Sequence, residues 1–203
     1  MGKITLPYRI IFILQLALIA AGAILCQLNS NNTLQLQLNQ YHTPFLDAIA
    51  RLGTHLGDGL FALIISLVFI VFLKKKSIPY LFIIWGSSIV AQLLKNIYGP
   101  TPRPIEFFKQ VPTVYYVPDV IILHSFSFPS GHTATAFGLA LALSFYFNNK
   151  YVTCVSLLIA CFVAFTRVYL MQHFIVDVVI GMIVAMLIGS VTIVLCQHVS
   201  EPK

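Results

Sequence analysis

Charged side chains are scarce in this chain of 203 residues. Asp, Glu, Lys and Arg make up only 9% of it, and 59% is hydrophobic, whereas a soluble domain carries about 25% charged residues. The scarcity excludes an ordinary soluble protein and predicts an integral membrane protein forming one domain over residues 1–203. The formal net charge is +6, but the basic residues lie at the ends of apolar runs and form no basic face. We therefore expect a lipid bilayer as partner, and no nucleic acid.

Recognisable metal-binding patterns are also missing. The chain has no CxxC pair, no carboxylate cluster and no Cys/His set with ligand spacing, so we expect neither a metal nor another cofactor. The cysteines fall within or beside apolar runs and are predicted to be small buried hydrophobic side chains. They are Cys26, Cys154, Cys161 and Cys196.

Long apolar runs are plentiful, and they predict an all-α polytopic membrane protein with six transmembrane helices. Polar breaks such as Lys74-Lys75-Lys76 separate the runs, because such charges are costly in hydrocarbon. The first run also suits a cleaved signal peptide, since Ala21-Gly22-Ala23 resembles a cleavage site. The predicted spans are residues 10–28, 57–73, 78–94, 132–147, 151–166 and 174–196.

Residues 29–58 are more polar. Leu34, Leu36 and Leu38 alternate with polar residues and predict an extended link, whereas the spacing of the apolar residues from Phe45 to Leu52 predicts a short amphipathic helix at the membrane surface. The polar side chains of this region are predicted to form a solvated face. They are His42, Asp47, Arg51 and His55.

The loop over residues 95–131 contains many prolines and aromatic residues. Proline prevents a long regular helix, and Tyr and Phe suit the headgroup layer, so this loop is predicted to lie along the membrane surface above a site.

The distribution of basic residues predicts the orientation. With a cytoplasmic N-terminus, seven basic residues fall on the inner side: Lys3, Arg9, Lys74, Lys75, Lys76, Lys150 and Lys203. Five fall on the outer side: Arg51, Lys95, Arg103, Lys109 and Arg167. By the positive-inside rule, the loop over residues 95–131 then faces the periplasm or exterior of a cytoplasmic (inner) membrane.

Several chemically active side chains gather at segment ends. His173 and Asp177 are four residues apart, so on a helix the carboxylate can orient the imidazole and leave its other nitrogen free as a base or nucleophile. The turn Ser130-Gly131-His132 directly precedes an apolar run, and a helix N-terminus binds anions through its free N–H groups.

Three cations lie at the ends of different segments, namely Lys95, Arg103 and Arg167. Cations that converge suit the oxygens of a phosphate group. Together with the two histidines and the aspartate, they indicate phosphoryl transfer through a histidine.

These residues resemble the three-part signature of the type 2 phosphatidic acid phosphatase (PAP2) superfamily. Arg103-Pro104 matches its first part, Pro129-Ser130-Gly131-His132 its second, and Arg167, His173 and Asp177 its third. Seven residues rather than six separate Lys95 from Arg103, and Thr166 replaces the usual serine.

The resemblance implies a metal-independent phosphatase. His173 would attack phosphorus to form a phosphohistidine, Asp177 would orient it, and His132 would protonate the leaving oxygen. The phosphate would be held by Lys95, Arg103, Ser130, Gly131, Thr166 and Arg167.

By the same resemblance, the substrate is a phosphorylated membrane lipid. The candidates are undecaprenyl pyrophosphate, phosphatidylglycerophosphate, phosphatidic acid and lipid A 1-phosphate. Transfer of the phosphoryl group to a second lipid is an alternative activity. A transporter or membrane scaffold is a non-enzymatic alternative, although polar residues lining a conduit should recur through the depth of the membrane.

Overall fold

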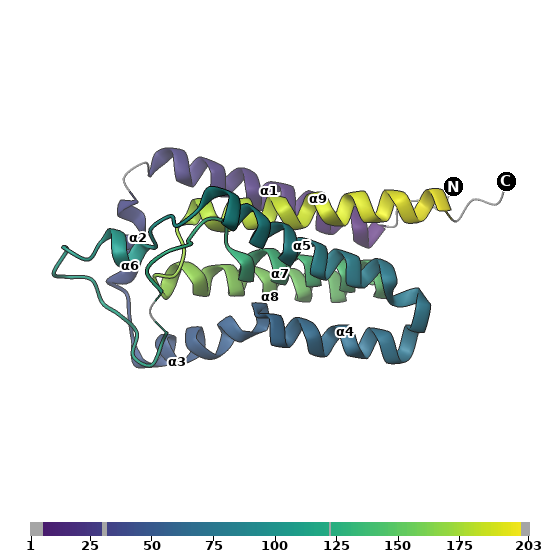
Figure 1. Ribbon diagram of the computed structural model, residues 1–203, viewed down its shortest axis with the longest axis horizontal. Helices are drawn as coiled ribbons and strands as arrows, with labels where there is room; N and C mark the ends of the chain where they lie inside the picture. The colour runs from purple at the N-terminus through teal and green to yellow at the C-terminus, as the bar shows by residue number, and fades with distance from the viewer. Residues whose placement is uncertain (1–5, 30–31, 122, 200–203) are drawn as a thin grey trace.

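The computed structural model describes residues 6–29, 32–121 and 123–199, and within these ranges it contains helices and no strands. Six long helices run side by side in a bundle (Figure 1). They are α1 (Leu6–Leu28), α4 (Gly59–Leu73), α5 (Ile78–Tyr98), α7 (Gly131–Phe147), α8 (Lys150–Tyr169) and α9 (Ile175–Val199). Each long helix overlaps one of the six predicted spans, so the predicted all-α fold is confirmed.

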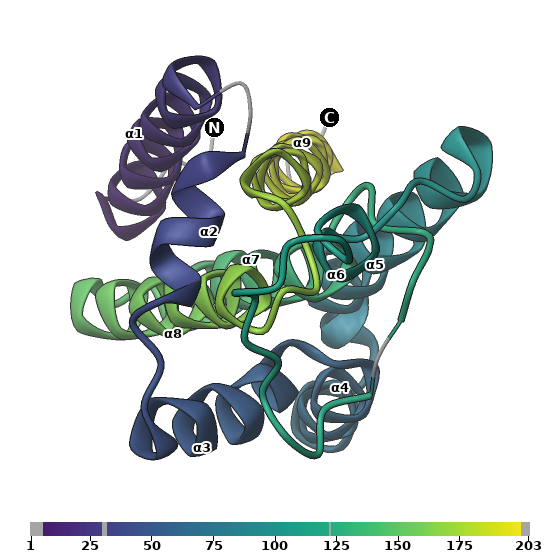
Figure 2. The ribbon, with the colours of Figure 1, turned by 90° about the vertical axis from the view of Figure 1, so that its left-hand side faces the viewer.

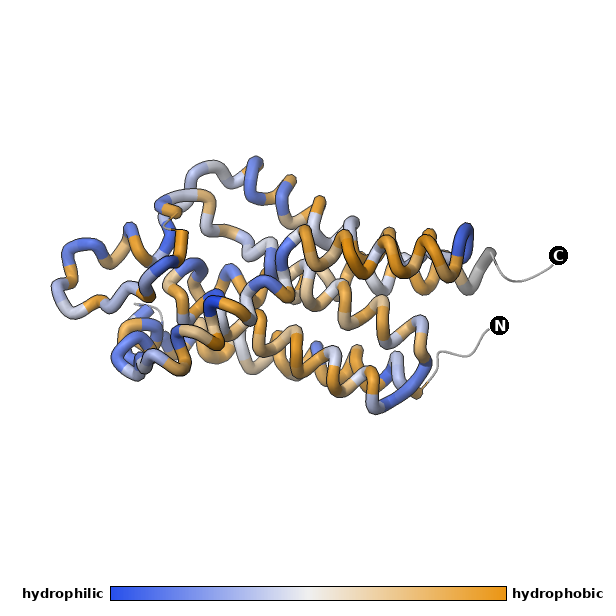
Figure 3. Tube along the Cα trace, turned by 90° about the horizontal axis from the view of Figure 1, so that it is seen from below, coloured by the Kyte–Doolittle hydropathy of each residue, from blue (hydrophilic) through white to orange (hydrophobic). Residues whose placement is uncertain are grey.

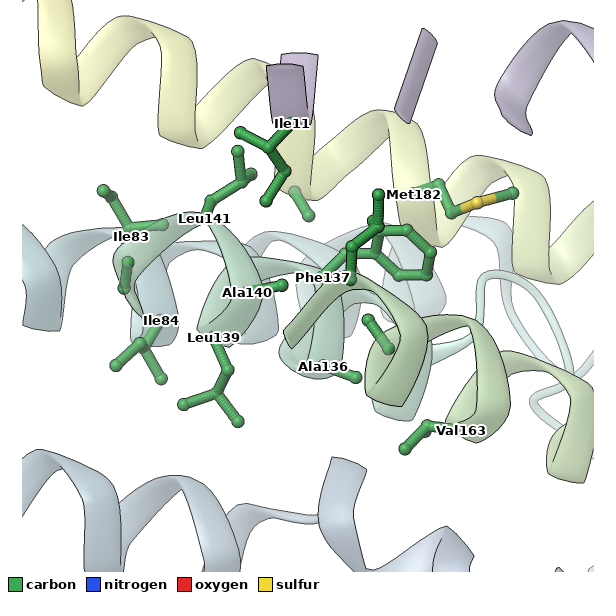
Figure 4. Close-up of a cluster of buried hydrophobic side chains, with 14 of the residues drawn as sticks. Ile11, Ile83, Ile84, Ala136, Phe137, Leu139, Ala140, Leu141, Val163 and Met182 are labelled. Atoms are coloured by element: carbon green, nitrogen blue, oxygen red, sulfur yellow. The ribbon is translucent and has the colours of Figure 1, made fainter. Parts of the chain in front are cut away.

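Helix α7 lies at the centre of the bundle, against α5, α8 and α9 (Figure 2). Small side chains let these helices approach closely: a Cβ atom added at Gly138 would lie 2.9 Å from Ser87 Oγ on α5. Phe137 and Leu141 project from α7 into the main hydrophobic cluster, in which α9 contributes Met182 (Figure 4). This packing fixes the N-terminal end of α7 relative to its neighbours.

The two ends of the bundle differ in character. One end carries the short helices α2 (Thr33–Asn39), α3 (Pro44–Gly53) and α6 (Pro104–Phe107), and the other carries η2 (Lys74–Ser77), which joins α4 to α5. Hydrophilic residues gather at both ends, and hydrophobic residues dominate the helices between them (Figure 3). This pattern is typical of a membrane protein.

Fewer helices than the six predicted spans are long and apolar enough to cross a membrane. By length and composition, three helices can cross a membrane, namely Leu6–Leu28, Lys150–Tyr169 and Ile175–Cys196, and a fourth crossing follows if Pro44–Gly57 and Gly59–Tyr98, bent by 47°, count as one. Helices α4 and α7 have 15 and 17 residues. They are therefore only about 22 and 26 Å long, less than the hydrocarbon thickness of about 30 Å.

The prediction of an extended link before α3 is wrong. Leu34, Leu36 and Leu38 lie on helix α2, whose buried residues are Gln35 and Asn39. The side chain of Asn39 both donates to the carbonyl oxygen of Tyr115 and accepts from its N–H, each at 2.8 Å. Gln35 and Asn39 thus face inward and bind neighbouring backbone, whereas Gln37 on the same helix is exposed.

The amphipathic helix α3 is present as predicted, but its Asp47 is not solvated. Asp47 is only 7% exposed and accepts hydrogen bonds from the hydroxyl groups of Tyr115 (2.7 Å) and Tyr169 (2.6 Å). Arg51 and His55, by contrast, keep exposed side chains. The two tyrosines supply the hydrogen bonds that the buried carboxylate needs. They connect α3 to the loop before α7, through Tyr115, and to α8, through Tyr169.

The prediction that the cysteines are buried is also wrong. Cys154 is exposed, and Cys26, Cys161 and Cys196 are partly buried. In a membrane protein, an apolar run can face lipid as readily as the core, so a position within such a run need not be buried. Of the basic residues used for orientation, Lys3 and Lys203 lie outside the described residues.

Candidate active site

The segment that joins α8 to α9 carries His173. After α8 ends at Tyr169, the chain turns through Met171 in a left-handed conformation (φ 56°). The N–H of His173 then donates to the carbonyl oxygen of Arg167 at 3.1 Å. These constraints place His173 directly before α9, and its side chain is only 1% exposed.

Asp177, on the first turn of α9, faces His173. Its Oδ2 lies 3.4 Å from His173 Nδ1 and accepts hydrogen bonds from the N–H of Phe174 (2.9 Å) and the hydroxyl of Ser127 (2.5 Å). The contact with Phe174 caps the helix, so Asp177 has a structural role as well as a position beside the imidazole. The carboxylate therefore lies on the Nδ1 side of the ring, although this contact is not a hydrogen bond and Nδ1 is buried without a partner among the described residues. A carboxylate on this side favours the tautomer with the proton on Nδ1, in which the lone pair of Nε2 is free.

The turn Ser130-Gly131-His132 begins α7. Ser130 is the N-cap residue, its oxygen accepting from Thr133, and its own N–H donates to the carbonyl oxygen of Asp177 at 3.0 Å. This bond joins the N-terminal ends of α7 and α9. A Cβ atom at Gly131 would meet no heavy atom within 4 Å in the part of the chain that the structure describes, so space is open beside the turn.

The three predicted cations are buried close to these residues. Lys95, on α5, donates to the carbonyl oxygen of Phe126 at 2.8 Å. Arg103 donates to the same oxygen (3.3 Å) and to both the backbone and side-chain oxygens of Gln172 (2.9 and 3.1 Å). Phe126 has a positive φ of 56°, so its carbonyl group is held in an uncommon backbone conformation where two cations share it.

Arg167 approaches from α8. One of its terminal nitrogens donates to Thr54 Oγ1 at 2.6 Å, in η1 (Thr54–Gly57), and its buried Nε has no hydrogen-bond partner among the described residues. Lys95, Arg103 and Arg167 are each less than 10% exposed. Buried charges are costly unless they are paired. Because Asp177 is the one carboxylate among the predicted site residues, the cations exceed the anions, which favours binding of an anion.

The electrostatics of His173 suit a nucleophile. Burial lowers the pKa of His173 well below its ordinary value, and nearby Arg167 and Arg103 lower it further. A lowered pKa keeps the imidazole neutral, with a free lone pair, at neutral pH. Burial also lowers the pKa of Arg103, an effect that Asp177 partly opposes.

His132 lines a cavity of roughly 400 Å³ that opens beside α3. Arg167 and Gln172 line the same cavity, together with Thr54 and Asp58. His132 lies within electrostatic range of both His173 and Arg167. A group bound in the cavity can therefore meet His132 and Arg167, whereas His173, Lys95 and Arg103 are not among the residues that line it.

The structure thus brings nearly all the predicted site residues to one end of the bundle, including Lys95 despite its longer spacing. Thr166 is less favourably placed, because its hydroxyl donates to Val163 within its own helix at 2.7 Å. The sequence did not indicate Ser127, Gln172 or Thr54, which hold the site residues in place. Each is a single polar residue outside the three motifs, and no local pattern distinguishes it.

Fold and site together define a helical membrane protein with a cluster of buried cations and histidines at one end of its bundle. The comparison with protein families then places it: residues 76–200 match the PAP2 superfamily model, and the chain belongs to that family. The resemblance predicted from the three motifs is confirmed.

One protein sequence and two crystal structures are similar to this chain. The chain is 29% identical over 136 residues to the lipid A 4'-phosphatase of Porphyromonas gingivalis, covering 62% of this chain and 56% of that protein, so it spans little more than half the length of that relative. The crystal structure of Aquifex aeolicus LpxE is similar with a TM-score of 0.69 and 27% identity, over 79% of this chain and 93% of that one.

The third is the crystal structure of the first transmembrane PAP2 type phosphatidylglycerolphosphate phosphatase from Bacillus subtilis. It has a TM-score of 0.71 and 22% identity, over 97% of this chain and 98% of that one. This likeness shows that the fold extends over nearly the whole chain.

Proposed function

We propose that this protein is a metal-independent lipid phosphatase, folded as one domain, that acts through a phosphohistidine. The observation that carries the proposal is the meeting of His173 and Asp177 with three buried cations at the N-terminal ends of α7 and α9. Helix N-termini and cations both favour a phosphate, and together they stabilise the charge that develops in phosphoryl transfer.

In the first step, Nε2 of His173 attacks phosphorus and the bond to the lipid oxygen breaks. Asp177 stabilises the positive charge of the imidazole through Nδ1, and His132 gives a proton to the departing lipid oxygen. Arg103, Lys95 and Arg167 hold the nonbridging oxygens, with the N–H groups of the Gly131 turn beside them.

In the second step, water attacks the phosphohistidine. His132, now neutral, takes a proton from this water, the bond between phosphorus and Nε2 breaks, and inorganic phosphate leaves. Ser130 contributes as the cap that fixes the turn. Thr166 is the least favourably placed of the proposed phosphate-binding residues, because its hydroxyl bonds within α8.

The substrate is proposed to be a phosphorylated membrane lipid. The named relatives favour lipid A and phosphatidylglycerophosphate, while undecaprenyl pyrophosphate and phosphatidic acid remain candidates. A substrate embedded in the bilayer suits a pocket at the end of a membrane bundle. We place the protein in the cytoplasmic membrane with the site facing the periplasm or exterior.

The test is release of phosphate from these four lipid classes by detergent-purified protein. His173→Ala is expected to lower the rate by at least roughly 10³-fold, because the nucleophile is lost. Full activity of this variant would overturn the assignment of the nucleophile. With labelled donor lipid, label appearing in a second lipid rather than in inorganic phosphate would instead favour phosphotransfer.

A further inference from the structure

Gln35 makes a contact with the nucleophile segment that the motifs do not include. It lies on α2, ahead of residues 76–200 that match the family model, and is 1% exposed. Its Nε2 donates to the carbonyl oxygen of His173 at 3.1 Å and to that of Val168 at 3.3 Å. One amide therefore spans the two sides of the turn that carries His173.

This contact fixes one particular peptide unit. The carbonyl group of His173 and the N–H of Phe174 belong to the same planar unit. The carbonyl oxygen accepts from Gln35, and the N–H donates to Asp177 Oδ2 at 2.9 Å. The unit that follows the nucleophile is thus held at both ends, by α2 on one side and by Asp177 on the other.

The remaining bonds of this segment come from α8. The N–H of His173 donates to the carbonyl oxygen of Arg167 at 3.1 Å. Without Gln35, that bond and the one to Asp177 would still hold the two N–H groups, but the carbonyl group of His173 would lose its bond to α2. Rotation of the peptide unit would then move the imidazole relative to the cations and His132.

We propose that Gln35 is a positioning residue for the nucleophile: it orients the backbone of His173 and does not touch the phosphate. This inference rests on the proposed function. It assigns α2 a role in the reaction that neither the three motifs nor the family match includes.

The chain offers a matched control in Gln37. It lies two residues away on the same helix, is exposed, and has the same side chain. Gln35→Ala and Gln35→Met both remove the amide, and the methionine keeps most of the volume, so that a cavity is not confused with the lost hydrogen bonds. Gln37→Ala reports any general effect of changing α2.

The experiment measures kcat, KM and their pH dependence for phosphate release by the full-length protein, with the best lipid substrate and with a small water-soluble aryl phosphate. Both Gln35 variants are expected to lower kcat roughly 10–100-fold with both substrates, because small misplacement of a reacting group has effects of this size. KM should change by less than about twofold, and Gln37→Ala should match the wild type.

The pH profile separates positioning from folding. The groups facing His173 are Lys95 from α5, Arg103 from the loop, His132 from α7, Arg167 from α8 and Asp177 from α9. None of them is altered in the Gln35 variants. Loosening the segment admits water to His173 and relieves its burial, so the acidic limb of the profile should move to higher pH.

Two results would overturn the inference while leaving the proposed function intact. One is a kcat of the Gln35 variants equal to that of the wild type. The other is a loss of activity that follows the folded fraction, measured by thermal unfolding, with an unshifted pH profile. If the wild type itself releases no phosphate from any of the four lipids or the aryl phosphate, the proposed function fails, and the inference fails with it.

Discussion

At the scale of single residues, the orientation of Asp177 depends on Ser127. The serine hydroxyl donates to Asp177 Oδ2, the oxygen nearest His173 Nδ1. Ser127→Ala should therefore lower kcat roughly 10–100-fold, since a hydrogen bond to a charged group contributes about 1.5–3 kcal/mol. Steady-state phosphate release measures this change.

A suitable control is Ser125→Ala. Ser125 contributes its carbonyl oxygen to Arg103, and that oxygen is retained in the variant. An equal loss of activity in the two variants would contradict a specific role for the Ser127 hydroxyl.

The lowered pKa of His173 leads to a prediction about the pH dependence of kcat/KM. Burial and the neighbouring cations lower the pKa of His173 well below 6.5. The imidazole of the free enzyme is therefore deprotonated at neutral pH and stays so until the pH falls to that lowered pKa. Acidification from pH 8 should therefore leave kcat/KM unaffected by His173 until the pH falls below about 6.5, the ordinary histidine value.

The measurement is kcat/KM between pH 4 and pH 8 with an aryl phosphate whose own ionisation is corrected for. An acidic limb centred above the ordinary histidine value would mean that His173 is more exposed, or closer to an anion, than the structure has it.

At the scale of elements, α2 and the loop before α7 depend on each other. Asn39 holds Tyr115 by two hydrogen bonds, and the ring of Tyr115 stacks on His42 at 3.6 Å between centroids. Asn39→Ala should cost roughly 1–3 kcal/mol of unfolding free energy, because it leaves backbone groups of the loop unpaired. Gln40→Ala, at an exposed neighbouring position, should cost almost nothing.

Amide hydrogen exchange shows whether the loss of stability arises at the contact between Asn39 and Tyr115. The amide of Tyr115 should exchange faster in Asn39→Ala than in Gln40→Ala, since its acceptor is gone. Equal exchange at this amide in the two variants would show that the loop is held without α2.

The long helices and the amphipathic α3 were predictable from sequence, whereas the short helices α2 and α6 were not. An apolar run of 15 or more residues leaves little choice but a helix in a membrane, so the ends of α4 and α7 agree with prediction within two residues. In α2, leucines at alternate positions also satisfy the four-residue spacing of a helix. Seven residues are too few to separate the two periods, and α6 is shorter still.

The site was predictable where its residues form motifs. Arg103, His132, His173 and Asp177 match the three motifs by their spacing, and the fold brings them to one end, while their roles in the reaction stay predictions. The supporting contacts join residues far apart in the chain, 50 residues for Ser127 with Asp177 and 138 for Gln35 with His173. A single sequence holds no local signal for such pairs, and their polar side chains resemble those of an exposed loop.

At the scale of the whole molecule, the directions in which the helices run determine at which end of the bundle the candidate site lies. Helices α7 and α9 begin, and α5 and α8 end, at the same end of the bundle (Figure 1). Two helix N-termini thus point their positive ends toward the site, and the cations at the ends of α5 and α8 complete it. The lysines of η2 lie at the opposite end.

This separation makes the orientation in the membrane testable. Lys109, 59% exposed, lies in the loop at the site end, whereas Lys75 is exposed in η2. In a background with the four native cysteines changed to alanine, Lys109→Cys should react with a membrane-impermeant maleimide in intact cells, because the positive-inside rule predicts that its end faces outward. Lys75→Cys should react only after the membrane is permeabilised. The reverse labelling pattern would place the site, and the phosphate it releases, on the cytoplasmic side.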